Sequence, residues 1–217
     1  MVELPLFPLH TVLFPGMPLP LHIFESRYKQ MVELCLEKDN TFGVVLIHRG
    51  NEALGPLAKP HSIGCTARII EVQPLGEGRM NITAVGERRF RIHSLNYDLP
   101  YLVGDVEFYP LPAEDPESLM PAAGRLAPKV QQYIRLLNEI EEVDLDPDNL
   151  PEDPVMLAQL AAVLLQMPPG EKQELLKSAS ALDLLDSTYQ VYNREIAFLR
   201  AIIDHGKDER QRHIRQN

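Results

Sequence analysis

The sequence has few cysteines, and the two it has stand far apart. Cys35 and Cys65 form no CxxC pair in a chain of 217 residues. A disulfide framework needs more cysteines, and a structural zinc site needs four ligands, which no cluster of Cys and His supplies here. The seven histidines are scattered without a spacing typical of catalysis or metal binding. We therefore expect two reduced thiols, no bound metal and no cofactor.

Long apolar runs are also missing. No stretch approaches the roughly 20 apolar residues that cross a bilayer. The N-terminus lacks the basic region and apolar core of a secretory signal. Hydrophobic residues make up 45% of the chain and charged residues 24%, as in an ordinary soluble globular protein. These features predict a cytoplasmic protein that has no membrane partner.

Positive charge is in deficit. The formal net charge is −10, and residues 111–217 carry 11 Lys and Arg against 19 Asp and Glu. Residues 1–110 are nearly balanced, with 10 against 12. Proteins that bind a nucleic-acid backbone usually present a basic face. Arg88, Arg89 and Arg91 form a short basic run, which we interpret as a charged surface. Nucleic acid is therefore disfavoured as a partner.

Proline is abundant near the start, with five prolines in residues 1–31. The alternation of apolar and other residues predicts strands at 4–9 and 17–24. They are joined by a turn at 14–16, because Gly16 readily takes the positive φ of a type II turn. Residues 25–38 then change to helical spacing, with one apolar face formed by Tyr28, Met31, Leu34 and Cys35.

The rest of the chain divides into a strand-rich part and a helical part. Short apolar runs predict strands at 41–48, 63–72, 79–85, 87–95 and 101–109, with a hairpin turn at 76–78. Prolines at 110–116 indicate a linker. Helices are predicted at 130–143, 155–167, 171–178 and 180–205, with Pro121 and Pro128 delaying the first and Gly206 ending the last. Four helices with short connections are typical of a bundle.

Several phrases of the sequence together resemble the N-terminal, substrate-recognition domain of Lon protease. LPLFPL at 4–9, VLFPG at 12–16 and LPLHIFESRYKQM at 19–31 match its opening strands, turn and helix. FGVVLIHRG, IGCTARI, GRMNITAVGERRFRI and PYLVGDVE match its later strands, and DPVMLAQLAAVLLQMPPGEKQELLKS its helices. The resemblance implies an α+β fold: a PUA-like twisted β-barrel with one helix over residues 1–112, a helical bundle over 113–206, and a polar tail at 207–217.

Other parts of a Lon protease have no counterpart in this sequence. A complete Lon protease continues into an ATPase with a GxxxxGK[ST] loop and a protease domain with a Ser–Lys dyad, and neither motif occurs. The SxxK pattern at 26–29 lacks the companion motifs of serine enzymes and opens an amphipathic helix. The tryptophan cage of cereblon-like relatives is absent, because the chain has no Trp. We expect a stand-alone or excised recognition domain that is not an enzyme.

The resemblance implies binding of unfolded or extended polypeptide. Two surfaces suit this role: an exposed strand edge that accepts a peptide as an added strand, and a crevice between barrel and bundle that takes apolar side chains. The candidate residues lie near the junction of barrel and first helix and are Phe14, Met17, Phe24 and Tyr28. For each of them, ordinary core packing is the alternative.

Three other hypotheses stay open. The acidic helical half suits an adaptor or regulatory subunit that docks on a separate protease or ATPase. RNA binding is known among PUA-like barrels, although the negative charge disfavours it here. A hydrolase would need a converging acid, base and nucleophile, which the sequence does not show. The acidic stretch 144–155 departs from an EF-hand loop at Asn149 and Val155, so calcium binding of that type is rejected.

Overall fold

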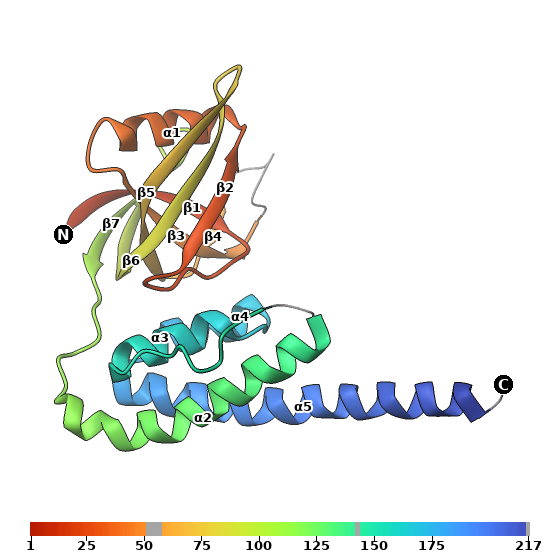
Figure 1. The fold of residues 1–217 in the computed structure, drawn as a ribbon. Helices are drawn as coiled ribbons and strands as arrows, with labels where there is room; N and C mark the ends of the chain where they lie inside the picture. Colours follow the sequence, from red (N-terminus) through yellow and green to blue (C-terminus); the bar gives the residue numbers. More distant parts are fainter. Residues whose placement is uncertain (51–57, 142–143, 216–217) are drawn as a thin grey trace. The chain divides into compact units, whose positions relative to one another are not determined.

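Strands dominate the first half of the chain and helices the second (Figure 1). The computed structural model describes residues 1–50, 58–141 and 144–215. The strands are β1 (Val2–Leu9), β2 (Pro18–Ile23), β3 (Thr41–Arg49), β4 (Lys59–Pro60), β5 (Ile63–Gly76), β6 (Arg79–Asn96) and β7 (Leu102–Phe108). The helices are α1 (Ser26–Leu36), α2 (Pro116–Glu141), α3 (Pro154–Leu164), α4 (Pro169–Leu176) and α5 (Ala181–Arg215). The expected mixture of strands and helices is confirmed.

Five of the strands form a closed ring. Each strand pairs with the next in the order β1-β7-β6-β5-β3, and β3 pairs with β1 again. β1 and β3 are parallel, with Leu6 opposite Gly43, and the other pairs of the ring are antiparallel. A parallel pair needs a crossover connection, which β2 and α1 supply. β2 lies off the ring and pairs along one edge with the first part of β6. Its other edge pairs with no strand in the part of the chain that the structure describes.

β6 is one strand of 18 residues, where the sequence predicted two. The predicted break falls at Gly86, where the turn after β1 packs against β6. A Cβ atom on Gly86 would lie 2.1 Å from the carbonyl oxygen of Phe14. The amide of Gly86 donates to the carbonyl of Met17 (2.9 Å), and the amide of Gly16 donates to the carbonyl of Gly86 (2.8 Å). Glycine at this position therefore admits a neighbouring backbone and does not end the strand.

Helix α1 packs an apolar face into the core of the strand-rich part. Its buried residues are Tyr28, Met31, Val32 and Cys35. The predicted face differs by one residue, since Leu34 is half-buried and Val32 is fully buried. Full burial of an apolar side chain of this size contributes about 1.5–3 kcal/mol. The helix therefore anchors the end of β2, from which it continues after two residues.

The two turns predicted in this part have the expected geometry. Gly16 has a φ of +79°, and the amide of Met17 donates to the carbonyl of Phe14 at 3.1 Å. The hairpin between β5 and β6 has positive φ at Glu77 and Gly78, as a two-residue type I′ turn requires. Lys29 of the SxxK pattern donates from Nζ to the carbonyl of Glu77 at 2.8 Å. This lysine therefore connects helix α1 to the hairpin between β5 and β6.

Helix α2 begins at Pro116 and contains Pro121 and Pro128, although the sequence predicted a start at residue 130. Both internal prolines are exposed, and so are Glu117 and Gly124, the residues whose carbonyls lose a backbone bond to them. The opposite side carries a continuous buried stripe, which consists of Leu119, Ala122, Ala123, Leu126, Val130, Tyr133, Ile134 and Leu137. Packing of this stripe outweighs the local cost of the prolines.

Helix α5 runs to Arg215, so the prediction that Gly206 ends it was wrong. A glycine inside a helix costs about 1 kcal/mol relative to alanine, and no proline follows it to force an end. The predicted capping at the start of the helix is confirmed. The amide of Asp183 donates to Oγ of Ser180 at 3.0 Å, and the carboxylate of Asp183 accepts from the amide of Ala179 at 2.9 Å.

The chain divides into two compact units. The strand unit comprises residues 1–111 and 166–178, and the helical unit comprises residues 112–165 and 179–217. Helix α4 thus belongs to the strand unit, whereas the sequence analysis placed it in the helical part. Arg89 of β6 donates from Nη1 to the carbonyls of Leu176 and Ser178, at 2.7 and 2.8 Å. This arginine is buried and caps the C-terminal end of α4, although the sequence suggested an exposed charge.

Candidate functional site

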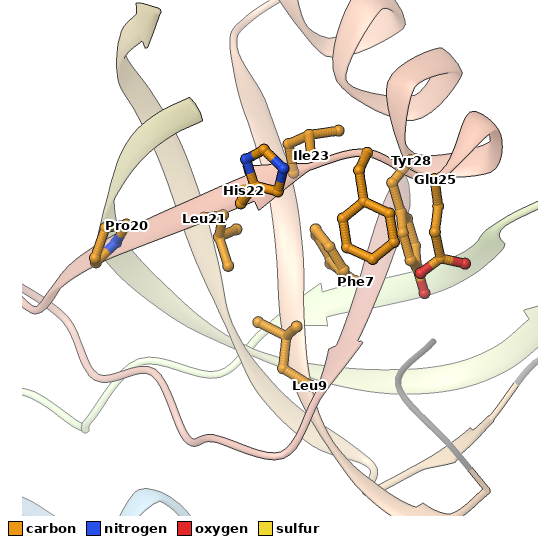
Figure 2. Close-up of a pocket in the computed structure, with 9 residues that line it drawn as sticks. Phe7, Leu9, Pro20, Leu21, His22, Ile23, Glu25 and Tyr28 are labelled. Atoms are coloured by element: carbon orange, nitrogen blue, oxygen red, sulfur yellow. The ribbon is translucent and has the colours of Figure 1, made fainter. Parts of the chain in front are cut away.

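A cavity of about 400 Å³ opens beside β2 in the strand unit (Figure 2). Its lining comprises the consecutive residues 20–25, together with Phe7 and Leu9 of β1 and Tyr28 of α1. Side chains of successive strand residues point to opposite faces of a sheet. A run of consecutive residues can therefore line one cavity when the cavity follows the edge of the strand. The unpaired edge of β2, which we call the outer edge, borders this cavity.

The floor of the cavity is apolar and firmly packed. Phe7 and Tyr28 stack with ring centroids 4.0 Å apart and an interplanar angle of 24°. The guanidinium of Arg27 lies 4.6 Å from the centroid of the Tyr28 ring. Figure 2 shows Phe7 and Tyr28 with their rings face to face, and Leu9 farther along the same side of the cavity. Phe7, Leu9 and Tyr28 are buried, so this floor is preformed.

The rim carries exposed aromatic side chains. Phe24 is 48% exposed, and its ring lies 5.8 Å from that of His22. His22 is oriented by a bond of 2.8 Å between its Nδ1 and Oδ1 of Asn81 on β6. At the α1 end of the cavity, the carboxylate of Glu25 accepts from Nε of Arg27 at 3.1 Å. An exposed aromatic ring above an apolar cavity suits the binding of an apolar side chain.

The structure brings together two of the four candidate residues from the sequence. Phe24 and Tyr28 both line the cavity. Phe14 is buried against β6 through the Gly86 contact, and Met17 is half-buried against the core cluster. Neither of these two is among the lining residues.

Sequence reasoning missed Phe7, Leu9 and His22 at this site. The alternation of prolines in β2 was the available signal, because prolines favour strand edges. The prolines do not indicate which residues from other strands lie beside the edge of β2. Phe7 and Leu9 reach the cavity because the ring places β1 beside it, and this placement depends on contacts distant in sequence.

A second cavity of about 300 Å³ lies between the start of β1 and the end of α1. It contains charges of both signs, from Glu3, Lys38, Asp39 and Arg88. Burial, assisted by the negative charge of Asp39, raises the pKa of the Cys35 thiol to about 11. Burial raises the pKa of the Cys65 thiol to about 12. Both thiols are free and protonated at neutral pH, so neither is an activated nucleophile.

Within residues 1–50, 58–141 and 144–215, no group of three or more His, Cys, Asp or Glu side chains is placed to hold a metal ion. None of the helices described there combines the length and apolar character needed to span a bilayer.

Comparison with known proteins identifies the family of this fold. Residues 3–194 match the family model of the ATP-dependent protease La (LON) substrate-binding domain. The chain is 27% identical over 199 residues to Lon protease 2 of Myxococcus xanthus, covering 91% of this chain and 24% of that protein. It is 28% identical over 219 residues to the Lon protease of Roseiflexus castenholzii, covering 98% and 27%. The chain thus spans about a quarter of the length of the curated relatives it matches.

Two solved structures share the fold. The crystal structure of a Lon N-terminal domain protein from Xanthomonas campestris has a TM-score of 0.64 and 28% identity, covering 86% of this chain and 96% of that one. The N-terminal domain of a Mycobacterium avium complex Lon protease has a TM-score of 0.68 and 17% identity, covering 88% and 98%. The matched part of the Lon proteins is the substrate-binding domain; their catalytic domains lie outside it.

Proposed function

This chain belongs to the family of LON substrate-binding domains, and on that premise we propose that it is a non-catalytic module that binds unfolded or extended polypeptide. The proposal places the binding site at the cavity beside β2. It further takes the closed ring of strands as a PUA-like barrel and the cytoplasm as the place of action.

The observation that carries the proposal is the combination of an apolar floor with an exposed aromatic rim. A folded protein offers few large apolar side chains on its surface, whereas an unfolded chain offers many. The cavity of about 400 Å³ holds a side chain of the size of leucine or phenylalanine. The stack of Phe7 and Tyr28 supplies the apolar contact, and Phe24 offers a further aromatic contact from the rim. Selection for exposed apolar side chains is selection for unfolded polypeptide.

The absence of catalysis is part of the same proposal. The groups that line the cavity are apolar, apart from His22, Glu25 and the tyrosine hydroxyl. Glu25 is engaged by Arg27 and His22 by Asn81. The two thiols of the chain lie elsewhere, buried and protonated. These contacts suit a surface that holds a segment and releases it unchanged.

The test is the binding of one polypeptide in its unfolded and folded forms. Ribonuclease A that is reduced and blocked with iodoacetamide is unfolded and carries no added charge, and native ribonuclease A is the matched folded control. We expect the 217-residue chain to bind the unfolded form and not the native one in fluorescence anisotropy. Phe24→Ser is expected to weaken binding about tenfold, because it removes an exposed aromatic contact. Phe198→Ser is the matched control on α5, where Phe198 is 61% exposed.

Equal binding of native and unfolded ribonuclease would refute the proposed function. Equal loss in the two phenylalanine variants would refute the proposed site. Since both side chains are about half or more exposed, neither substitution is expected to change the thermal midpoint of unfolding by more than a few degrees.

A second candidate function is docking on a separate protease or ATPase. The uneven charge favours it, since residues 111–217 carry 19 Asp and Glu against 11 Lys and Arg. An acidic docking surface predicts a complex that forms at low ionic strength and dissociates as salt rises. Affinity capture by the 217-residue chain at low and high salt tests this docking. A captured protease or ATPase that is retained equally at both salt concentrations would contradict a charge-driven complex.

A further inference from the structure

We propose that the polypeptide binds by strand addition to the outer edge of β2, as an extended segment with a large apolar side chain and no net negative charge. This inference rests on the proposed function and specifies how the segment is held. The backbone of the segment pairs with β2, and one of its side chains enters the cavity over Phe7 and Tyr28.

The register of β2 determines which backbone groups face outward. The amide of Gly86 on β6 donates to the carbonyl of Met17 at 2.9 Å, so position 17 directs its backbone groups toward β6. Antiparallel pairing then continues without a shift from Pro18 to Ile23. Because hydrogen-bonding direction alternates along a strand, positions 19, 21 and 23 also face β6. Positions 18, 20 and 22 therefore face outward, toward the cavity edge.

Proline occupies two of the three outward positions. Pro18 and Pro20 have no amide to donate, so they fit where β6 requires no donor. The outward edge consequently offers the carbonyls of Pro18, Pro20 and His22 as acceptors and the amide of His22 as its donor. Prolines protect an edge against indiscriminate pairing. Here the prolines leave one outward position, His22, that can both donate and accept a backbone hydrogen bond, and it lies directly beside the cavity.

A segment paired at His22 places its side chains as the cavity requires. Leu21 and Ile23 belong to the inner, core-facing side of β2, while His22 and Phe24 lie on the outer side. An added strand continues this alternation. One of its side chains therefore points inward against Phe7, Leu9 and Tyr28, and the next ones point outward beside Phe24. Figure 2 shows the strand of Pro20, Leu21, His22 and Ile23 running above this floor.

Charge selects among extended segments. Residues 1–110, which form the cavity, carry 10 Lys and Arg against 12 Asp and Glu, a net charge of −2. The carboxylate of Glu25, which accepts from Nε of Arg27 at 3.1 Å, lines the cavity at its α1 end, and the described lining residues include no Lys or Arg. A segment with acidic residues is repelled over the range of a Debye length, whereas a neutral or basic segment is not. The occupant is therefore an apolar segment with neutral or basic flanks.

The test isolates one backbone donor. His22→Pro removes the outward amide and leaves the pairing with β6 intact, because position 22 does not face β6. His22→Ala is the matched control, since it removes the side chain and its bond to Asn81 but keeps the amide. For a fluorescent nine-residue peptide with a central leucine and lysine flanks, we expect His22→Pro to bind about tenfold more weakly than His22→Ala. Circular dichroism and the thermal midpoint confirm that both variants are folded.

Amide exchange measured by nuclear magnetic resonance gives a second readout in the unmodified chain. In the free protein we expect the amides of Leu21 and Ile23, which face β6, to be protected and that of His22 to exchange fast. Bound peptide is expected to protect His22. Replacement of the lysine flanks by glutamate is expected to weaken binding at low salt, with the difference lost at about 1 M salt.

The outcomes separate this inference from the proposed function. Binding of unfolded ribonuclease with equal affinities of His22→Pro and His22→Ala would overturn strand addition and leave peptide recognition standing. Residues 70–75 of β5 pair with β6 on one side and with no strand on the other among the described residues. Protection there in place of His22 would locate the segment on that edge and also overturn strand addition to β2. Absence of binding to any unfolded polypeptide would refute the proposed function itself.

Discussion

Replacement of Arg89 by methionine is expected to weaken the attachment of helix α4 to the strand unit. Arg89 donates from Nη1 to the carbonyls of Leu176 and Ser178, at 2.7 and 2.8 Å. Its guanidinium also lies 4.9 Å from the ring centroid of Tyr109. Methionine keeps most of the apolar stem and removes the donors, so the change isolates the contribution of Arg89, while Nε2 of Gln173 still donates to the carbonyl of Ile63 at 3.0 Å.

The magnitude follows from the two carbonyls. A buried carbonyl that loses its donor costs about 1–3 kcal/mol, which makes about 2–6 kcal/mol for the pair. Two features offset part of this. Burial lowers the pKa of Arg89, so the native protein bears a desolvation cost, and its Nη2 has no hydrogen-bond partner among the described residues. We therefore expect Arg89→Met to lower the free energy of unfolding by about 2–3 kcal/mol.

The assay combines urea unfolding, followed by far-UV circular dichroism, with amide exchange of α4. The neighbouring Arg88→Met is the matched control, because Arg88 is exposed and lies 3.7 Å over the ring of Phe108. The control is expected to cost less than about 1 kcal/mol. Faster exchange confined to residues 169–178 in Arg89→Met would support the reasoning. A loss no larger than that of Arg88→Met, or unchanged exchange in α4, would refute it.

Three further predictions concern other parts of the fold. Gly86→Ala is expected to destabilise the protein by about 2–4 kcal/mol in urea unfolding, because its Cβ would lie 2.1 Å from the carbonyl oxygen of Phe14; a cost under about 1 kcal/mol would contradict the close packing of this turn. Pro128→Ala is expected to raise the thermal midpoint by a few degrees, since it restores a backbone bond on the exposed side of α2; a lower midpoint would show that the proline is needed. The pKa values of Cys35 and Cys65, about 11 and about 12, lie above the ordinary thiol value of 9.0, so the folded state keeps its thiol protons to higher pH than the unfolded state. The two protonated thiols therefore contribute fully to stability below about pH 9, and this contribution is lost as the pH rises toward 11–12. Urea unfolding across this range should show a free energy of unfolding that declines less steeply with pH in Cys35→Ala than in the unmodified chain. An identical decline in the two proteins would contradict the raised pKa.

Much of the strand unit could be predicted because its signals are local. The positive φ of Gly16, the hairpin at 76–78 and the buried face of α1 each depend on residues adjacent in sequence. The course of β6 could not be predicted in the same way. Gly86 looks like a strand break in isolation, and its role depends on the backbone of Phe14, more than 70 residues earlier.

The helical half shows the same division. Capping at Ser180 and Asp183 is local and was predicted correctly. The start of α2 and the end of α5 were predicted wrongly, because proline and glycine were weighed by their local cost alone. Packing of the buried stripe of α2 provides the larger free energy, and it depends on neighbours that the sequence does not specify.

For the candidate site, the sequence alone determined the family, the proline-marked strand β2 and the aromatic residues at its end. These are properties of contiguous residues, and a strand's alternation and a proline's missing amide are local facts. The tertiary structure decided that Phe24 and Tyr28 share a cavity with Phe7 and Leu9, and that Phe14 does not. It also decided that β6 occupies one edge of β2 and leaves the other unpaired in the described chain. A strand edge can bind a peptide only where no other strand pairs with it, and strand pairing depends on contacts between segments that are distant in sequence.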